Sequence, residues 1–196
     1  MSNIHYLFPT VIFYKENILD KKELIKIKKF SKEILNKNDS RGNNWLSKIK
    51  NSHDEYDVCK DKRFNPLITN ITTEVNNFNK EHNSKYEYKN ASFGWLNLYK
   101  YNDHQEYHTH NGYRYSIIYC VEGEKEKDKS TEVSFRNPYV DMLPPKNINN
   151  HNELTYEYVS FKPVENSLLI FRSHLMHYVH NHLNKKQRIT LALNYE

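Results

Sequence analysis

The chain has 196 residues, a formal net charge of +5 and a pI near 8.9. Its 37% hydrophobic and 14% aromatic content, with only 4 glycines and 6 prolines, excludes a low-complexity or disordered protein. A chain of this length can bury one hydrophobic core, so we expect a single domain over residues 1–196. Most of the positive charge comes from lysines interleaved with acidic residues, which favours a solvated helical face over a nucleic-acid partner.

Cysteine spacing and hydropathy exclude further classes of protein. Cys59 and Cys120 are far apart and form no CxxC motif, so neither a disulfide framework nor a zinc knuckle is expected. The N-terminus has no basic segment followed by an apolar core, and no apolar run approaches about 18 residues. We therefore expect a soluble, cytoplasmic protein with no membrane partner.

The first part of the chain, about 1–85, is predicted to hold an extended segment followed by helices. Residues 4–16 read as extended, and Pro9 marks an edge or a bulge. Asp20 is a candidate N-cap for a helix over about 21–37, where apolar residues recur at helical spacing.

A polar stretch, 38–62, separates this helix from the next. It predicts a long loop, in which Trp45 and Leu46 would act as an anchor. A second helix is expected over about 66–80. Its predicted buried face consists of Leu67, Ile68, Ile71, Val75 and Phe78.

From about residue 86 to the C-terminus the pattern changes to strands. The segment 86–101 alternates, which places one set of side chains on a common face: Trp95, Asn97, Tyr99 and Tyr101. Further strands are expected in 114–123, 130–138, 155–164, 167–173, 176–182 and 187–195. An irregular loop over about 137–153 is long enough to be a lid or substrate loop. Helices followed by short strands predict a mainly β, α+β fold, an antiparallel sandwich or barrel with helices on one sheet.

Two groups of histidines among the eleven in the chain lie in these strands. The first is His104, His108 and His110, and the second is His174, His177, His180 and His182. If extended, His108 and His110 point to the same side, and a turn of the chain could bring His177 to them. Three such side chains on a rigid sheet could hold Zn²⁺, Fe²⁺ or Mn²⁺ and leave open positions. The alternative is that these are core or surface histidines without a metal.

Short motifs along nearly the whole chain follow one another in the order of a known superfamily. They are Leu-Phe-Pro-Thr at 7–10, Trp-Leu-Asn at 95–97, His-Thr-His at 108–110, Ser-Ile-Ile-Tyr at 116–119, Phe-Arg-Asn-Pro at 135–138, Leu-Ile-Phe-Arg-Ser at 169–173, His-Tyr-Val at 177–179 and Arg-Ile-Thr at 188–190. With them the chain resembles the Fe(II)- and 2-oxoglutarate-dependent oxygenases, and within these a branch of marine bacteria and phages with a His-x-His…His pattern.

The resemblance implies a double-stranded β-helix core, a cupin-like jelly roll, over about 86–196. It also implies an Fe(II) site at His108, His110 and His177. The superfamily has a carboxylate where this chain has His110. Either His110 is the third ligand, or a carboxylate such as Glu106 or Asp103 completes the site, or His110 does not bind.

A cosubstrate site is implied by the same resemblance. Arg188, on the strand after His177, would bind the distal carboxylate of 2-oxoglutarate as a planar, bidentate cation once a short hairpin turned it inward. Thr190 faces the same way and could add a hydroxyl contact. Tyr99 and Asn97 are candidates for further hydrogen bonds to 2-oxoglutarate, with core and cross-strand packing as the alternative.

The implied activity is that of an oxidoreductase, a dioxygenase that converts 2-oxoglutarate and O₂ to succinate while oxidising, most simply hydroxylating, a small-molecule or peptide substrate. One alternative is a three-histidine, cupin-type metalloenzyme that does not use 2-oxoglutarate. Another is a non-catalytic β-sandwich binding module. The segment Tyr113-Arg114-Tyr115 and the loop with Pro144 and Pro145 are expected to border the pocket.

Overall fold

A computed structural model describes residues 9–37, 46–47, 49–124, 131–139 and 155–196. The helices are α1 (Lys21–Lys37) and α2 (Asn65–Glu81), with two short 3₁₀ helices, η1 (Val58–Lys60) and η2 (Lys62–Phe64). The strands are β1 (Ile12–Glu16), β2 (Lys50–Asn51), β3 (Phe93–Tyr99), β4 (Gln105–His108), β5 (Tyr115–Glu122), β6 (Val133–Arg136), β7 (Tyr158–Phe161), β8 (Ser167–Arg172), β9 (His177–Val179) and β10 (Arg188–Tyr195).

The strands form two antiparallel sheets. The larger sheet has the order β1-β8-β5-β10-β3-β2, and the smaller one has the order β4-β9-β6-β7. Successive strands often lie in different sheets, because the chain crosses from β8 to β9 and back from β9 to β10. The fold is therefore a double-stranded β-helix with two added helices, and the expected fold class is confirmed. Within the described part of the chain, neither α1 nor α2 has the length and hydropathy of a membrane-spanning helix.

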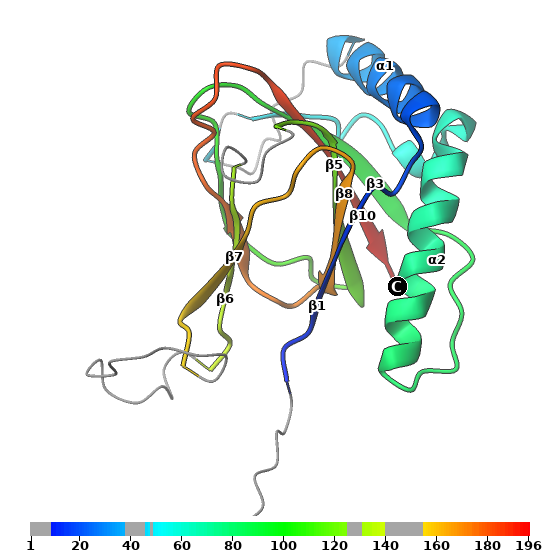
Figure 1. Ribbon diagram of the computed structural model, residues 1–196, viewed down its shortest axis with the longest axis vertical. Helices are drawn as coiled ribbons and strands as arrows, with labels where there is room; N and C mark the ends of the chain where they lie inside the picture. Colours follow the sequence, from blue (N-terminus) through cyan, green and yellow to red (C-terminus); the bar gives the residue numbers. More distant parts are fainter. Residues whose placement is uncertain (1–8, 38–45, 48, 125–130, 140–154) are drawn as a thin grey trace, which may run out of the picture.

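The central strands of the larger sheet are buried on both faces. Both helices lie against one face of this sheet, and β6 and β7 of the smaller sheet lie on its other side (Figure 1). In β10 the side chains of Ile189, Leu191 and Leu193 pack into the helix-side core, whereas Arg188, Thr190 and Ala192 line a pocket between the sheets. The period-two alternation thus gives β10 one apolar face and one face available for polar side chains.

The two predicted helices are confirmed, because their apolar periodicity and capping signals are local. Asp20 accepts a hydrogen bond at Oδ1 from the backbone N of Glu23, at 2.8 Å, as an N-cap side chain does. All five apolar residues predicted for the buried face of α2 are buried: Leu67, Ile68, Ile71, Val75 and Phe78. Cys120 is also fully buried, on β5.

The long strand predicted over 86–101 is shorter at both ends. At its start the backbone is bound by helix side chains, since Asn79 Nδ2 donates to Tyr86 O at 2.7 Å and Asn76 Nδ2 donates to Tyr88 O at 2.9 Å. At its end a turn begins, in which Asn102 has a positive φ of 69°. Tyr101 therefore leaves the common face and is 63% exposed.

Leu46 was expected to anchor the loop 38–62, and this prediction is wrong. Leu46 is 91% exposed, and its backbone N donates to Glu106 Oε1 at 2.7 Å. The same stretch also contains β2 and η1, and η2 begins at its last residue. Trp45, residues 7 and 8 of the first motif, and the loop with Pro144 and Pro145 lie outside the described residues.

Asn166 gives a first testable prediction on stability. It has a φ of 65°, and its buried amide makes three hydrogen bonds: Leu19 N (3.0 Å) and Tyr119 OH (2.7 Å) donate to Oδ1, and Nδ2 donates to Leu19 O (2.8 Å). Asn166→Gly keeps the backbone conformation but loses these bonds, so it should lower the free energy of unfolding by about 3 kcal/mol. Asn166→Ala should lower it by about 1 kcal/mol more. Urea denaturation measures both, and an Asn166→Ala protein as stable as wild type would contradict the assignment.

Candidate functional site

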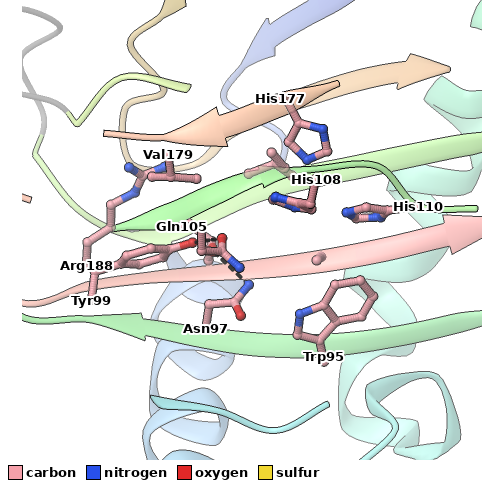
Figure 2. A pocket seen from close by; sticks show the side chains of 12 residues that line it. Trp95, Asn97, Tyr99, Gln105, His108, His110, His177, Val179 and Arg188 are labelled. Atoms are coloured by element: carbon pink, nitrogen blue, oxygen red, sulfur yellow. Dashed lines mark hydrogen bonds between the residues drawn. The ribbon is translucent and has the colours of Figure 1, made fainter. Parts of the chain in front are cut away.

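The three histidines of the predicted metal site meet between the two sheets. His108 ends β4 and His177 begins β9, and the two residues are direct cross-strand partners. His110 follows two residues after His108, and its backbone N donates to Ser173 O at 2.9 Å. The ring centroids of His108 and His177 are 4.1 Å apart, and His110 lies 5.3 Å from the first and 5.2 Å from the second. One nitrogen from each ring lies within 4.8 Å of the other two, so the three could hold one metal ion (Figure 2).

Each of these rings is oriented through its Nδ1 atom. The Nδ1 atoms of His108 and His177 lie 2.7 Å from Glu106 O and 3.0 Å from Leu175 O. A backbone carbonyl can only accept, so Nδ1 carries the hydrogen in both rings. His110 Nδ1 lies 2.8 Å from Asn194 Oδ1 and makes the equivalent bond. These tautomers leave the lone pair on Nε2, which is the form of imidazole that binds a metal ion.

Burial keeps the three imidazoles neutral. It lowers the pKa of His108 to about 4 and lowers that of His110. For His177, burial together with repulsion from His108 and His110 lowers the pKa well below its usual value. Neutral rings do not have to lose a proton before they bind a cation near pH 7.

The metal-free protein should therefore lose stability as the pH falls from 7 towards 4. The unfolded chain takes up a proton at its ordinary histidine pKa, about 6.5, whereas folded His108 does so near 4. The free energy of unfolding is therefore highest above about pH 6.5 and falls as the pH is lowered from about 6.5 to about 4. The decrease is at most about 1.4 kcal/mol per pH unit for each histidine whose pKa is lowered in this way. Urea denaturation at pH 7, 6 and 5 measures the slope. A His108→Gln protein with an equal slope would contradict this explanation.

The carboxylates considered as alternative ligands are engaged elsewhere. Glu106 accepts from the backbone N atoms of Leu46 and Ser47, at 2.7 and 3.3 Å. Burial raises the pKa of Glu106, but hydrogen bonds from its own backbone and from Leu46 and Ser47 outweigh this effect, so the pKa is lowered. Asp103 accepts from Lys100 N at 2.7 Å. Neither carboxylate belongs to the three-residue group that could hold a metal ion, whereas His110 does.

The other histidines of the two groups do not join this cluster. His104 and His174 are exposed. His180 points to Ser134, with Nε2 2.7 Å from its Oγ, and His182 is buried against Thr131 and Lys186. His177 and Val179, two residues apart in β9, both line the pocket as alternation with period two requires, whereas His180 and His182 do not.

The predicted cosubstrate residues line the same pocket, deeper between the sheets. Arg188 pairs with Tyr99 and Thr190 pairs with Asn97 across β10 and β3, so all four side chains share one face. Figure 2 shows Arg188 and Tyr99 at one end of the pocket and His110, with Trp95 beneath it, at the other. Asn97 Nδ2 donates to Thr190 Oγ1 at 3.4 Å.

Arg188 has an unusual environment for a cation. It is 1% exposed, and its guanidinium lies over the Tyr99 ring with Cζ 5.4 Å from the centroid. Nη1 donates to Thr131 O at 3.0 Å, whereas Nε and Nη2 have no hydrogen-bond partner among the described residues. Nε and Nη2 form one edge of the guanidinium, the edge that binds a carboxylate through two parallel bonds. A buried cation that has no ion pair with any described residue calls for an anion.

Two functional candidates were not predicted from the sequence: Gln105, which lines the pocket, and Asn194, which contacts His110. Gln105 accepts a hydrogen bond from the Tyr99 hydroxyl. Burial raises the pKa of Tyr99 to about 12, although Arg188 and a hydrogen bond with Thr190 act to lower it. Tyr99 therefore stays neutral. Asn194 orients His110, as described above. The spacing of Gln105 from His108 gave no signal, because a register shift in β4 interrupts the alternation between them.

Two expectations about the surroundings of the site are wrong. No hairpin joins His177 to Arg188, because β9 and β10 lie in different sheets and the chain crosses between them. The segment Tyr113-Arg114-Tyr115 does not line the pocket. Tyr115 points to the helix side of the larger sheet, where its hydroxyl donates to Asn79 Oδ1 at 2.8 Å.

Solved structures with a similar fold include three that cover nearly all of this chain. A prolyl-4-hydroxylase from Pseudomonas putida has a TM-score of 0.63 at 10% identity, over 95% of this chain and 94% of that chain. A prolyl hydroxylase from Trichoplax adhaerens, in complex with a hypoxia inducible factor peptide fragment, has a TM-score of 0.63 at 14% identity, over 94% and 83%. The non-heme α-ketoglutarate-dependent epimerase SnoN from nogalamycin biosynthesis has a TM-score of 0.68 at 10% identity, over 95% and 78%. At these identities the likeness is one of fold.

Sequence comparison adds the family. No curated protein gives a significant match to the chain. A family model described as "Putative 2OG-Fe(II) oxygenase" matches residues 94–194, more than half of the chain. This segment begins in β3, ends in β10 and contains every residue of the three-histidine cluster and of the Arg188 end of the pocket. The sequence match and the jelly-roll core agree, and the chain belongs to the 2OG-Fe(II) oxygenase family.

Proposed function

We propose that this protein is a dioxygenase that couples the conversion of 2-oxoglutarate and O₂ to succinate and CO₂ with the oxidation, most simply the hydroxylation, of a C–H bond in a small-molecule or peptide substrate. Fe(II) and 2-oxoglutarate, the cofactors of its family, supply the oxidising chemistry when bound. The described residues bind and orient these cofactors and exclude water from the space between the sheets.

His108, His110 and His177 are the proposed Fe(II) ligands. Their nitrogens converge within 4.8 Å, and hydrogen bonds at Nδ1 leave Nε2 for the metal ion. Three neutral ligands leave the full positive charge of the ion uncompensated by protein. We infer that this charge strengthens the attraction for the dianionic cosubstrate.

Arg188 is the proposed partner of the distal carboxylate of 2-oxoglutarate. The observation that carries the proposal is the unpaired Nε–Nη2 edge of this buried guanidinium in the pocket that the histidines also line. Thr190, Tyr99 and Asn97 surround the same space and supply hydroxyl and amide groups for the remaining hydrogen bonds. Burial keeps the Tyr99 phenol protonated, so it meets an anion as a neutral side chain.

The test is anaerobic addition of Fe(II) and 2-oxoglutarate to the purified protein. We expect a weak visible charge-transfer band that requires both additions, and succinate formation once O₂ is admitted. The same addition to a His108→Ala protein should give no band. If wild-type protein gives no band at saturating concentrations of both, the proposed function is wrong.

A further inference from the structure

His182 is a buried histidine outside the metal cluster, and its surroundings connect it to Arg188. It is 0% exposed. Its ring joins two segments of the chain, because Nδ1 lies 2.7 Å from Thr131 Oγ1 and Nε2 lies 2.6 Å from Lys186 O. Lys186 O can only accept, so Nε2 carries a hydrogen, and in this tautomer Nδ1 accepts from the Thr131 hydroxyl.

Both contacts of His182 connect it to Arg188. The carbonyl oxygen of Thr131 accepts a hydrogen bond from Arg188 Nη1 at 3.0 Å, and Lys186 lies two residues before Arg188 in the chain. His182 thus closes a ring of contacts that runs from Thr131 through the Arg188 side chain and backbone to Lys186. Its own backbone is fixed as well, since its N donates to Asp103 O at 2.8 Å and its O accepts from Asn102 N at 2.7 Å.

This ring of contacts determines which edge of the guanidinium remains available. With Nη1 held on Thr131 O, the planar group cannot rotate without breaking that bond, and within the described part of the chain Nε and Nη2 have no hydrogen-bond partner. A long arginine side chain otherwise has many rotamers, and ordering it on binding would reduce affinity.

We propose that His182, acting through Thr131, is a positioning residue that holds Arg188 with its Nε–Nη2 edge ready for the distal carboxylate of 2-oxoglutarate. The proposal rests on the proposed function, because it assigns that carboxylate to Arg188. It adds a role for two side chains that are not expected to touch either metal or cosubstrate.

The experiment compares two ligands on Mn(II)-loaded protein by titration calorimetry: 2-oxoglutarate, and 2-oxopentanoate, which has the same chain length but no distal carboxylate. Thr131→Val keeps the shape and the carbonyl but removes the hydroxyl, and should weaken 2-oxoglutarate binding about fivefold to tenfold. His182→Leu removes both ring contacts and should weaken it by more than about tenfold. Binding of 2-oxopentanoate and the Mn(II) stoichiometry should stay as in wild type for both.

Two control variants make the result specific. In His182→Asn the side-chain amide oxygen is bonded to Cγ, as Nδ1 is in histidine, so it can accept a hydrogen bond from the Thr131 hydroxyl. This variant should therefore keep more of the affinity for 2-oxoglutarate than His182→Leu. His180→Leu alters a histidine two residues away that contacts Ser134, and it should bind both ligands like wild type.

The outcomes separate this inference from the function on which it rests. If His182→Leu and Thr131→Val bind 2-oxoglutarate with wild-type affinity, or lose affinity for both ligands equally, the positioning role is wrong while the proposed function stands. If wild-type protein does not prefer 2-oxoglutarate to 2-oxopentanoate, the assignment of Arg188, and with it the proposed function, is wrong.

Discussion

His177→Ala is expected to abolish Fe(II) binding and, with it, all turnover. The imidazole is 1% exposed and lies against both other histidines, so its loss removes the most buried of the three proposed ligands. Loss of a residue that is only hydrogen-bonded to a metal ligand lowers metal affinity by up to roughly 100-fold. Loss of a ligand itself should lower the affinity for Fe(II) by more than that. Metal analysis after anaerobic reconstitution measures the stoichiometry. His108→Ala and His110→Ala should have the same effect.

His174→Ala is the matched control for His177→Ala, because His174 is exposed and lies only three residues earlier. It should retain the wild-type metal content, as should His180→Ala. Circular dichroism of each variant checks that the fold is intact. A His174→Ala protein without metal, together with a His177→Ala protein that keeps it, would show that the assignment in β9 is wrong and would also weaken that of Arg188.

Arg188→Ala is expected to weaken 2-oxoglutarate binding by about 3 kcal/mol, roughly 100-fold. The reason is that a carboxylate buried at this position would lose its charged, bidentate partner. Arg188→Lys keeps the charge but not the planar edge, so its affinity should be intermediate. Calorimetric titration of the Mn(II)-loaded protein measures both, and metal content should not change.

Arg172→Ala is the control for a general loss of positive charge, because Arg172 ends β8 in an exposed position. The Arg188 variants also separate the oxygenase from a three-histidine metalloenzyme that oxidises a substrate without 2-oxoglutarate. In such an enzyme Arg188→Ala would leave turnover largely intact. Unchanged turnover would therefore favour that alternative.

Local patterns account for the parts of the fold that could be predicted. The helix α1 follows from the N-cap Asp20 and from apolar residues at helical spacing. The strand β10 follows from an alternation that places Arg188 and Thr190 on one face of the strand and Ile189 and Leu191 on the other. Both features depend on neighbours within a few residues. By contrast, Tyr86 and Tyr88 read as strand residues, but their backbone is bound by side chains of α2.

The residues of the site that could be predicted are those whose side-chain type suggests a function, such as metal binding by histidine or carboxylate binding by arginine. The His-Thr-His pair and the arginine after His177 meet this condition, and the structure brings them into one pocket. Asn194 could not be found in this way, because its bond to His110 joins residues 84 positions apart. The crossing between β9 and β10 was missed for a related reason: sequence spacing shows that two strands are consecutive but not that they belong to different sheets.

The proposed metal ligands are divided between the two sheets, and this has a consequence for folding. His108 and His177 belong to the smaller sheet, whereas His110 is tied through Asn194 to β10 of the larger one. An ion bound by all three would act as a crosslink between the sheets and could bind only after they had docked. Metal should therefore slow unfolding rather than speed folding. In the apo protein, amide protons of β6 and β7 should exchange with solvent well before those of β5 and β10, which are buried under the helices.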